Sequence, residues 1–121
     1  MNGVVHFEVP TDNLVRAQKF YAEVFGWKTT ELPELGTVMM ETTESEHGRP
    51  KRPGSINGSM TLRQDLSRQP VIVIAVASID ETIAAVEQAG GSVVQAKIAM
   101  SNNAHYARVI DSEGNVIGLW E

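Results

Sequence analysis

The chain has 121 residues, of which 42% are hydrophobic and 21% charged, with a net charge of −5 and no cysteine. This composition is typical of one globular domain and excludes disordered, collagen-like and coiled-coil chains. The lack of cysteine excludes disulfides, thiolate metal sites and a cysteine nucleophile. The acidic charge disfavours nucleic-acid partners. The longest apolar run, 70–77, is far below the roughly 20 residues of a membrane span. The N-terminal segment lacks signal-peptide features, so we expect a cytoplasmic protein without a membrane partner.

The chain begins with a predicted strand over residues 4–9. Its apolar and polar residues alternate, which places His6 and Glu8 on the same side of the strand. Pro10 is expected to end it.

A helix is predicted to follow over residues 14–25, where apolar residues recur at helical spacing. Thr11 or Asp12 can cap its start, and Gly26 is expected to end it. The aromatic residues of this region are expected to lie in the core: Phe20, Tyr21, Phe25 and Trp27.

Three more strands are predicted at 27–32, 37–43 and 56–63. Residues 44–55 carry two prolines and no periodicity, which predicts a mobile surface loop. A small basic cluster lies in this loop: Arg49, Lys51 and Arg52. We interpret the cluster as solvated surface, the alternative being a lid that steers an anionic ligand.

The second half of the chain repeats this order of elements. A strand at 71–77 leads into a helix with the capping signature Ser78-x-x-Glu81, which Gly90-Gly91 ends. Strands follow at 92–98, 105–110 and 116–121, the last two joined by a turn at 111–115. Residues 4–9 align without gaps with 71–76, which indicates a duplication. We expect one domain, 1–121, built of units at about 3–63 and 70–121.

Several phrases resemble the vicinal oxygen chelate superfamily, which includes glyoxalase I, extradiol dioxygenases, fosfomycin-resistance enzymes and bleomycin-resistance proteins. They are Val4 to Asp12, Phe20-Tyr21-x-x-x-Phe25-Gly26-Trp27, Gly90-Gly91 and the closing segment 111–121. Residues 53–58 further resemble a subgroup of predicted lactoylglutathione-lyase-related proteins. The resemblance implies an α+β fold in which two βαβββ units form cupped mixed sheets around a cavity, with helices outside. It also implies a homodimer.

The resemblance implies a divalent metal, Zn, Ni, Fe or Mn, on two His or Glu ligands from each unit. His6 stands at the first ligand position and Glu121 at the last, but Val73 stands at a third, and the strand 56–63 offers only Asn57. Two good ligands are one short of the three usual for catalytic zinc. The cavity is expected to be lined by His6, Glu8, Met39, Asn57, Val73, Leu119 and Glu121.

Three functions stay open. The first is a small-molecule-binding protein or enzyme with an incomplete metal site, in which His6 donates a hydrogen bond or acts as a general base and Glu121 orients it. The second is a metal-dependent lyase or dioxygenase with His6 and Glu121 as ligands. The third is a non-enzymatic, drug-sequestering resistance protein. The ligand is not readable, because pocket shape decides it.

Overall fold

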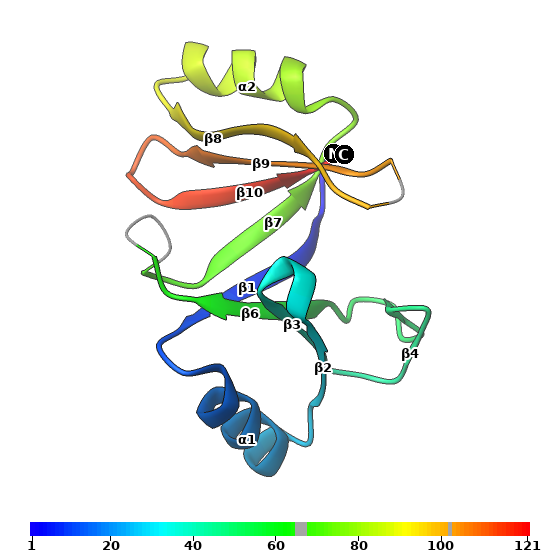
Figure 1. Cartoon of the computed structure of the whole chain (residues 1–121). Helices are drawn as coiled ribbons and strands as arrows, with labels where there is room; N and C mark the ends of the chain where they lie inside the picture. Colours follow the sequence, from blue (N-terminus) through cyan, green and yellow to red (C-terminus); the bar gives the residue numbers. More distant parts are fainter. Residues whose placement is uncertain (65–67, 102) are drawn as a thin grey trace. The chain divides into compact units, whose positions relative to one another are not determined.

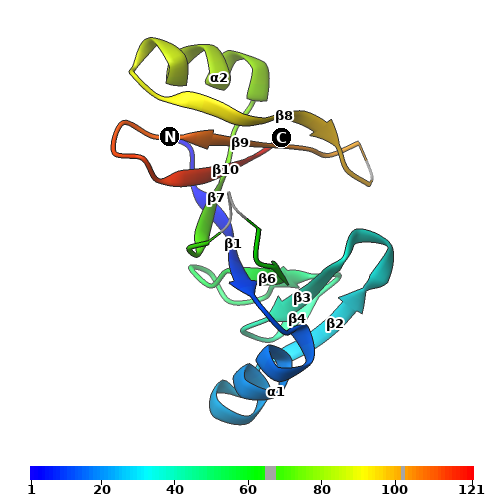
Figure 2. The ribbon, with the colours of Figure 1, turned by 60° about the vertical axis from the view of Figure 1, so that its left-hand side comes forward.

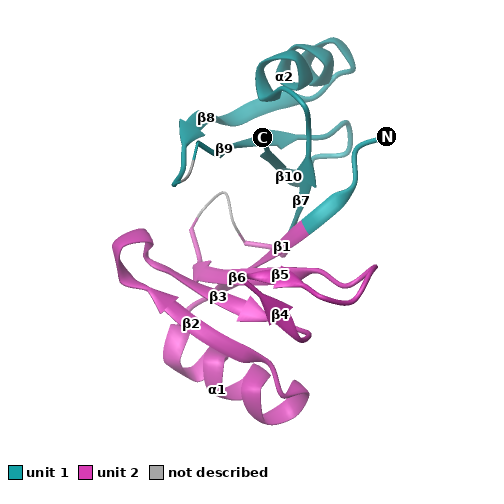
Figure 3. Cartoon of the chain, turned by 90° about the vertical axis from the view of Figure 1, so that its right-hand side faces the viewer, with its two compact units in different colours: residues 1–5, 71–121 teal, residues 6–70 magenta. Residues whose placement is uncertain are grey.

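A computed structural model describes residues 1–64, 68–101 and 103–121. Contacts divide the chain into two compact units (Figure 3): unit 2 holds residues 6–70, and unit 1 holds residues 1–5 and 71–121. In the described residues, no helix has the length and apolar character needed to cross a membrane.

Unit 2 is a sheet with one long helix. Its elements are β1 (Val4–Thr11, from His6 onward), α1 (Leu14–Phe25), β2 (Lys28–Leu32), the short 3-10 helix η1 (Pro33–Leu35), β3 (Thr37–Glu41), β4 (Ser45–Glu46), β5 (Arg49–Pro50) and β6 (Asn57–Leu62). The strands of its main sheet are ordered β2-β3-β6-β1. The β1–β6 pair is parallel and the other two pairs are antiparallel. In Figures 1 and 2, α1 lies on one side of this sheet.

The end of β1 and the start of α1 both differ from the prediction. Strand β1 continues through Pro10 to Thr11, because the parallel partner β6 extends alongside it and Arg63 N–H donates to the carbonyl of Thr11 at 2.8 Å. A proline is tolerated in a strand where its missing N–H is not needed by a neighbour. The helix cap is Asn13, whose side chain accepts a hydrogen bond from Arg16 N–H at 2.9 Å, and not Thr11 or Asp12. The predicted end is confirmed: Gly26 closes α1 with a left-handed φ of 69°.

The core of unit 2 lies between α1 and the sheet. Val38, Met40 and Met60 are fully buried there, with Phe7, Val9, Leu14, Ala17, Tyr21 and Trp27 packed around them. The prediction of four core aromatics is wrong for Phe20 and Phe25, which are 53% and 56% exposed. Only the stripe of α1 that carries Leu14, Ala17 and Tyr21 faces the sheet, and Phe20 and Phe25 flank it.

Residues 44–55 are more ordered than the predicted loop. Strands β4 and β5 form a small antiparallel hairpin, hereafter the basic hairpin (residues 44–52). His47 and Gly48 link the strands with positive φ values of 50° and 76°. Positive φ at both central residues is the pattern of a tight two-residue hairpin turn. The base of the hairpin is closed by Lys51 N–H, which donates to the carbonyl of Glu44 at 2.9 Å.

Unit 1 repeats the arrangement of unit 2. It contains β7 (Val71–Ala75), α2 (Ile79–Gln88), β8 (Ser92–Ala99), β9 (His105–Ile110) and β10 (Val116–Trp120), ordered β7-β10-β9-β8 in its sheet. The predicted cap is confirmed, because the Ser78 side chain accepts a hydrogen bond from Glu81 N–H at 3.2 Å. The core beneath α2 is built from Ile79, Ala107, Val109 and Leu119. The polar sequence of residues 64–69 predicts a connector between the two units, and it includes residues 65–67, which lie outside the described residues.

The predicted α+β class is confirmed, with one α-helix and a mixed sheet in the described part of each unit. The contact boundary falls inside β1, between Val5 and His6. The first residues group with unit 1, where Ala75 N–H donates to the carbonyl of Gly3 at 3.0 Å. The division into 3–63 and 70–121 within one domain stays a prediction.

Candidate functional site

One face of the unit 2 sheet packs on α1, and the other is polar. Phe7 packs in the core beneath α1. Successive strand residues point to opposite faces, so His6 and Glu8 point away from the helix. In the parallel register of β1 and β6, Asn57 pairs with His6 and Ser59 pairs with Glu8, so these two share that side. We call this surface the helix-free face of unit 2.

Met39 belongs to the same face. It pairs with Ser59 across β3 and β6. Its neighbour Met40 is fully buried in the core under α1, so Met39 points the other way. Met39 therefore lies on the helix-free face of unit 2, and its predicted role in lining a cavity stays a prediction.

His6 is the titratable centre of the helix-free face of unit 2. Its Nε2 lies 3.0 Å from Ser59 Oγ, and Glu8 and Ser59 are 9% and 6% exposed. Burial lowers the pKa of His6 below 6.5 because it penalises the charged imidazolium, while the nearby negative charge of Glu8 acts in the opposite direction. The imidazole is therefore neutral at pH 7, and Glu8 is placed to stabilise positive charge on the ring.

The side chain of Asn57 anchors the basic hairpin through hydrogen bonds. Its Nδ2 donates to Ser45 Oγ at 2.9 Å and to the carbonyl of Gly48 at 3.1 Å. Its Oδ1 accepts a hydrogen bond from Thr42 N–H at 3.0 Å, and the residue is 5% exposed. The amide expected to line a cavity thus ties the hairpin to the strand beside His6.

Val73 and Leu119, two of the residues of unit 1 that are expected to line the cavity, lie on opposite faces of its sheet. Leu119 packs in the core beneath α2 with Ile79 and Ala107. Val73 pairs with Gly118, the neighbour of Leu119 in β10, and so points away from the helix. Of the two, only Val73 lies on the face of unit 1 that is free of its helix.

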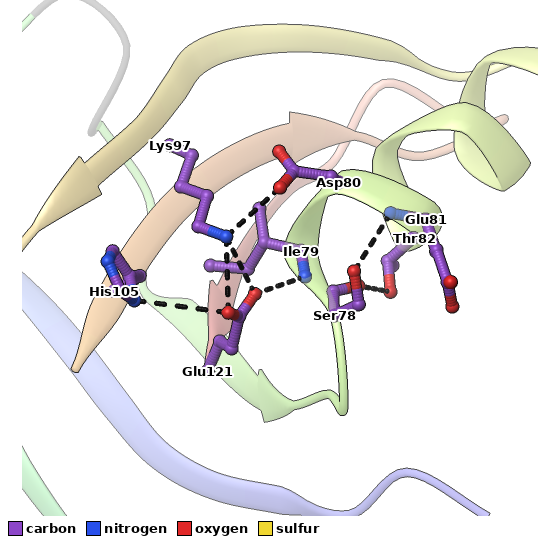
Figure 4. Close-up of polar contacts among 8 residues, drawn as sticks. All are labelled: Ser78, Ile79, Asp80, Glu81, Thr82, Lys97, His105 and Glu121. Carbon is purple, nitrogen blue, oxygen red and sulfur yellow. Dashed lines mark hydrogen bonds and ion pairs between the residues drawn. The ribbon is translucent and has the colours of Figure 1, made fainter. Parts of the chain in front are cut away.

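Glu121 is the centre of a polar cluster at the start of α2 (Figure 4). Its Oε2 accepts a hydrogen bond from Ile79 N–H at 2.6 Å, and Lys97 Nζ lies 3.1 Å from both carboxylate oxygens. Lys97 also reaches Asp80 Oδ2 at 3.0 Å, and His105 Nδ1 is 3.9 Å from Glu121 Oε1. The Ile79 N–H and then Lys97 hold the pKa of Glu121 below its ordinary value. Glu121 therefore completes the N-terminal cap of α2.

The donor set does not fit a four-ligand metal site. Within the described ranges, no three His, Asp or Glu side chains are grouped so that they could hold a metal ion. The Glu121 carboxylate is engaged by an ammonium group and a helix N-terminus, and the charge of Lys97 opposes a divalent cation there. His6, Glu8 and, by strand parity with Met39, Glu41 are residues of metal-ligating type on the helix-free face of unit 2.

Three residues of these helix-free faces were not predicted. Ser59 is the hydrogen-bond partner of His6. On the corresponding face of unit 1, Arg108 Nε donates to Tyr106 Oη at 2.9 Å. A β carbon on Gly118 would lie 2.9 Å from both Tyr106 Oη and Val73 Cγ2. Strand parity could have found them, because Ser59 follows Asn57 by two, and Tyr106 and Arg108 alternate with core residues.

Two surface hollows lie elsewhere in unit 2. One, of about 320 Å³, is walled by residues that include Asp12, Arg16, Phe20 and Arg63. The other, of about 540 Å³, lies against the basic hairpin and is lined by Glu46, His47, Arg49, Pro50 and Lys51. His6 lines neither hollow. The case for His6 as a functional residue therefore depends on its burial and on its hydrogen bond with Ser59.

Comparison with known proteins adds two findings. Residues 4–43 match the family model described as bleomycin resistance protein-like N-terminal. A search of the curated proteins finds no match.

Several solved structures share the fold. A glyoxalase/bleomycin resistance protein/dioxygenase superfamily member from Vibrio splendidus 12B01 has a TM-score of 0.67 at 13% identity, over 99% of this chain and 98% of that one. A methylmalonyl-CoA epimerase variant from Streptomyces coelicolor, in complex with 2-nitronate-propionyl-CoA, has a TM-score of 0.66 at 16% identity, over 99% and 94%. The Mycobacterium tuberculosis methylmalonyl-CoA epimerase has a TM-score of 0.61 at 17% identity, over 98% and 87%. The chain thus has the fold of the glyoxalase/bleomycin resistance protein/dioxygenase superfamily.

Proposed function

We propose that the chain binds a small organic molecule on the helix-free face of unit 2 and that His6 accepts a proton from it. The observation that carries the proposal is the partly buried, neutral imidazole of His6, 3.0 Å from Ser59 Oγ and close to Glu8. A general base must be uncharged before the reaction and stabilised once it is charged. Burial favours the first condition and Glu8 favours the second.

The direction of the hydrogen bond between Ser59 and His6 decides whether Nδ1 of His6 accepts a proton or donates a hydrogen bond. When Nε2 donates to Ser59 Oγ, Nδ1 carries the lone pair and is the proton-accepting atom. When Ser59 donates to Nε2 instead, Nδ1–H is a hydrogen-bond donor. The same pair thus supports both roles expected of His6, proton acceptor and hydrogen-bond donor.

We further infer that the ligand is a carbonyl compound with an acidic C–H bond, as in an acyl thioester. Similar folds occur in methylmalonyl-CoA epimerases, and one such epimerase has been solved with methylmalonyl-CoA bound. A neutral histidine base beside a carboxylate suits removal of a proton next to a carbonyl group. The relation to the lactoylglutathione-lyase-related subgroup, predicted from residues 53–58, stays a prediction.

The test is exchange of the acidic C–H of methylmalonyl-CoA in D₂O, followed by NMR. We expect the wild type to exchange this proton and His6→Gln to be slower by roughly 10²–10⁴-fold, the usual contribution of a general base. His105→Gln is the matched control, because His105 belongs to the Glu121 cluster of unit 1. The wild-type exchange rate should decrease when the pH is lowered below the pKa of His6, because the imidazole is then protonated and cannot act as a base.

Three outcomes separate the functions. Equal exchange in the wild type and His6→Gln contradicts a role for His6 as the base. Saturable binding without exchange supports a sequestering protein over an enzyme. A rate that depends on a stoichiometric bound transition metal, found by elemental analysis, supports the metal-dependent lyase or dioxygenase instead.

A further inference from the structure

We propose that the basic hairpin recognises a phosphate group on the ligand of the helix-free face of unit 2, with Arg49 and Arg52 supplying the charge. This inference rests on the proposed function, because it places both groups on one ligand. It narrows the proposed ligand from a small organic molecule to a phosphorylated molecule that carries a reactive carbonyl group.

The first support is the local charge. The chain has a net charge of −5, yet positions 49–52 hold three of its ten Lys and Arg residues. Lys51 Nζ is paired with Glu44 Oε1 at 3.0 Å. Among the described residues, the guanidinium groups of Arg49 and Arg52 have neither a hydrogen bond nor an ion pair. Two exposed guanidinium groups that have no carboxylate partner in the described part of the chain are therefore available to an anion from outside it.

The second support is the shape of the surface. The hollow of about 540 Å³ against the hairpin is lined by Arg49, Lys51 and His47 together with Glu46 and Pro50. Its volume lies within the roughly 300–1,000 Å³ of ordinary small-molecule sites. A guanidinium group binds phosphate oxygens in a bidentate manner, and an ammonium group adds a point charge. Among the lining residues, Arg49 and Lys51 carry positive charge and Glu46 carries negative charge, and Lys51 is paired with Glu44. The guanidinium group of Arg49 is therefore the lining group available to an anion in the hollow.

The third support is the connection between the hairpin and His6. Asn57 holds the hairpin through its bonds to Ser45 Oγ and the Gly48 carbonyl. In the β1–β6 register the same Asn57 is the partner of His6. Paired strands lie about 4.8 Å apart, so the anchor of the hairpin is adjacent to the proposed base.

This arrangement suits a ligand with two ends. A phosphate held by the hairpin supplies binding energy at a distance from the reacting carbon, and that energy helps to position the C–H bond at His6. Because the hairpin is already tied to β6, little ordering is needed when the phosphate binds. Coenzyme A thioesters have this two-ended chemistry.

The experiment compares two thioesters that differ in the 3′-phospho-ADP part of coenzyme A, which carries all of its phosphate groups. Isothermal titration calorimetry measures the Kd of methylmalonyl-CoA and of the same acyl group on pantetheine, which lacks phosphate. For the double variant Arg49→Gln/Arg52→Gln we expect methylmalonyl-CoA to bind roughly 10–100-fold more weakly, as for loss of charge-assisted hydrogen bonds. Binding of the pantetheine thioester should be unchanged.

A matched control removes two charges from elsewhere on unit 2. Arg16 and Lys19 are exposed on α1, which covers the opposite face of the sheet, and Lys19 pairs only loosely with Glu23 at 3.7 Å. The variant Arg16→Gln/Lys19→Gln should bind both ligands as the wild type does. Raising the salt concentration should weaken wild-type binding of methylmalonyl-CoA more than that of the double Arg variant.

The outcomes distinguish this inference from the proposed function. If the double Arg variant binds methylmalonyl-CoA as tightly as the wild type, the role of the hairpin is overturned, while exchange by His6 is unaffected. If both thioesters lose affinity equally in that variant, the arginines do not recognise phosphate and the inference is also wrong. If the His6→Gln exchange test fails while the Arg effect on Kd persists, the proposed function falls and phosphate recognition stands.

Discussion

The Glu121 carboxylate stabilises unit 1 in its charged form. Its partners are Ile79 N–H at 2.6 Å and Lys97 Nζ at 3.1 Å, and they hold its pKa below the ordinary value. A carboxyl group with a lowered pKa in the folded state adds stability above its unfolded pKa of about 4.3. That contribution is lost as pH falls through the folded pKa.

We therefore expect Glu121→Gln to lower the free energy of unfolding at pH 7, because the amide keeps an oxygen for Ile79 but loses its charge for Lys97. The deficit should shrink as pH falls below about 4 and the wild-type carboxyl becomes neutral. Urea denaturation between pH 3 and pH 7 measures it, the pH limits spanning roughly the titration range of a carboxyl group. Glu87→Gln, at an exposed position of α2, serves as the control. A deficit independent of pH would contradict the charged-cap role.

Sequence reasoning reached part of this residue-scale chemistry. Strand parity was enough to place His6 and Glu8 on one face. It could not assign Glu121 to α2, because Ile79 and Lys97 lie 42 and 24 residues away and are brought to it by the tertiary fold. It also missed the bonds of Asn57, since their partners belong to a hairpin without hydrophobic periodicity.

At the scale of elements, the close contact of β6 with β1 depends on a residue without a side chain. A β carbon on Gly58 would lie 2.5 Å from Phe7 Cε2, and Phe7 packs on Trp27 with ring centroids 5.8 Å apart. Gly58→Ala must therefore push the Phe7 ring into a filled core. We expect a loss of about 1–3 kcal/mol in the free energy of unfolding, the usual effect of overpacking.

Chemical denaturation of Gly58→Ala and Gly3→Ala tests this expectation. A β carbon on Gly3 would have nothing within 4 Å, so this glycine is the matched control. Equal stability of both variants and the wild type would mean that Phe7 moves freely, against the packing described for the core of unit 2.

The elements themselves were largely predictable where local signals act alone. Gly26 and Ser78 mark helix ends by their own backbone and side-chain chemistry, and both predictions are confirmed. The prediction failed at Pro10, where pairing with β6 outweighs the local tendency of proline to end a strand. It also failed at β4–β5, where the turn at His47 and Gly48 organises a short hairpin that no periodic pattern reveals.

At the scale of the whole molecule, the repeated order of strands and helices was visible in the sequence, because each unit carries its own periodic pattern. The resemblance to the superfamily predicts a homodimer. Large apolar side chains of α1 remain exposed in unit 2, namely Val15, Phe20, Val24 and Phe25. Burying exposed apolar surface favours association.

We expect light scattering coupled to size-exclusion chromatography to give twice the mass of the chain at micromolar concentration. Dilution should then reveal the monomer if the dimer is weak. A monomeric mass at every concentration tested would contradict the homodimer prediction.

The crowding at Gly118 limits how this fold could acquire new chemistry. Any side chain introduced there meets the Tyr106 hydroxyl and Val73, which already occupy the space above β10. A single substitution that adds a carboxylate or imidazole at this position therefore starts with a steric penalty. Before a carboxylate or imidazole can be introduced at Gly118, in evolution or in the laboratory, Tyr106 or Val73 has to be replaced by a smaller residue. The order of the mutations therefore decides whether the new side chain is tolerated.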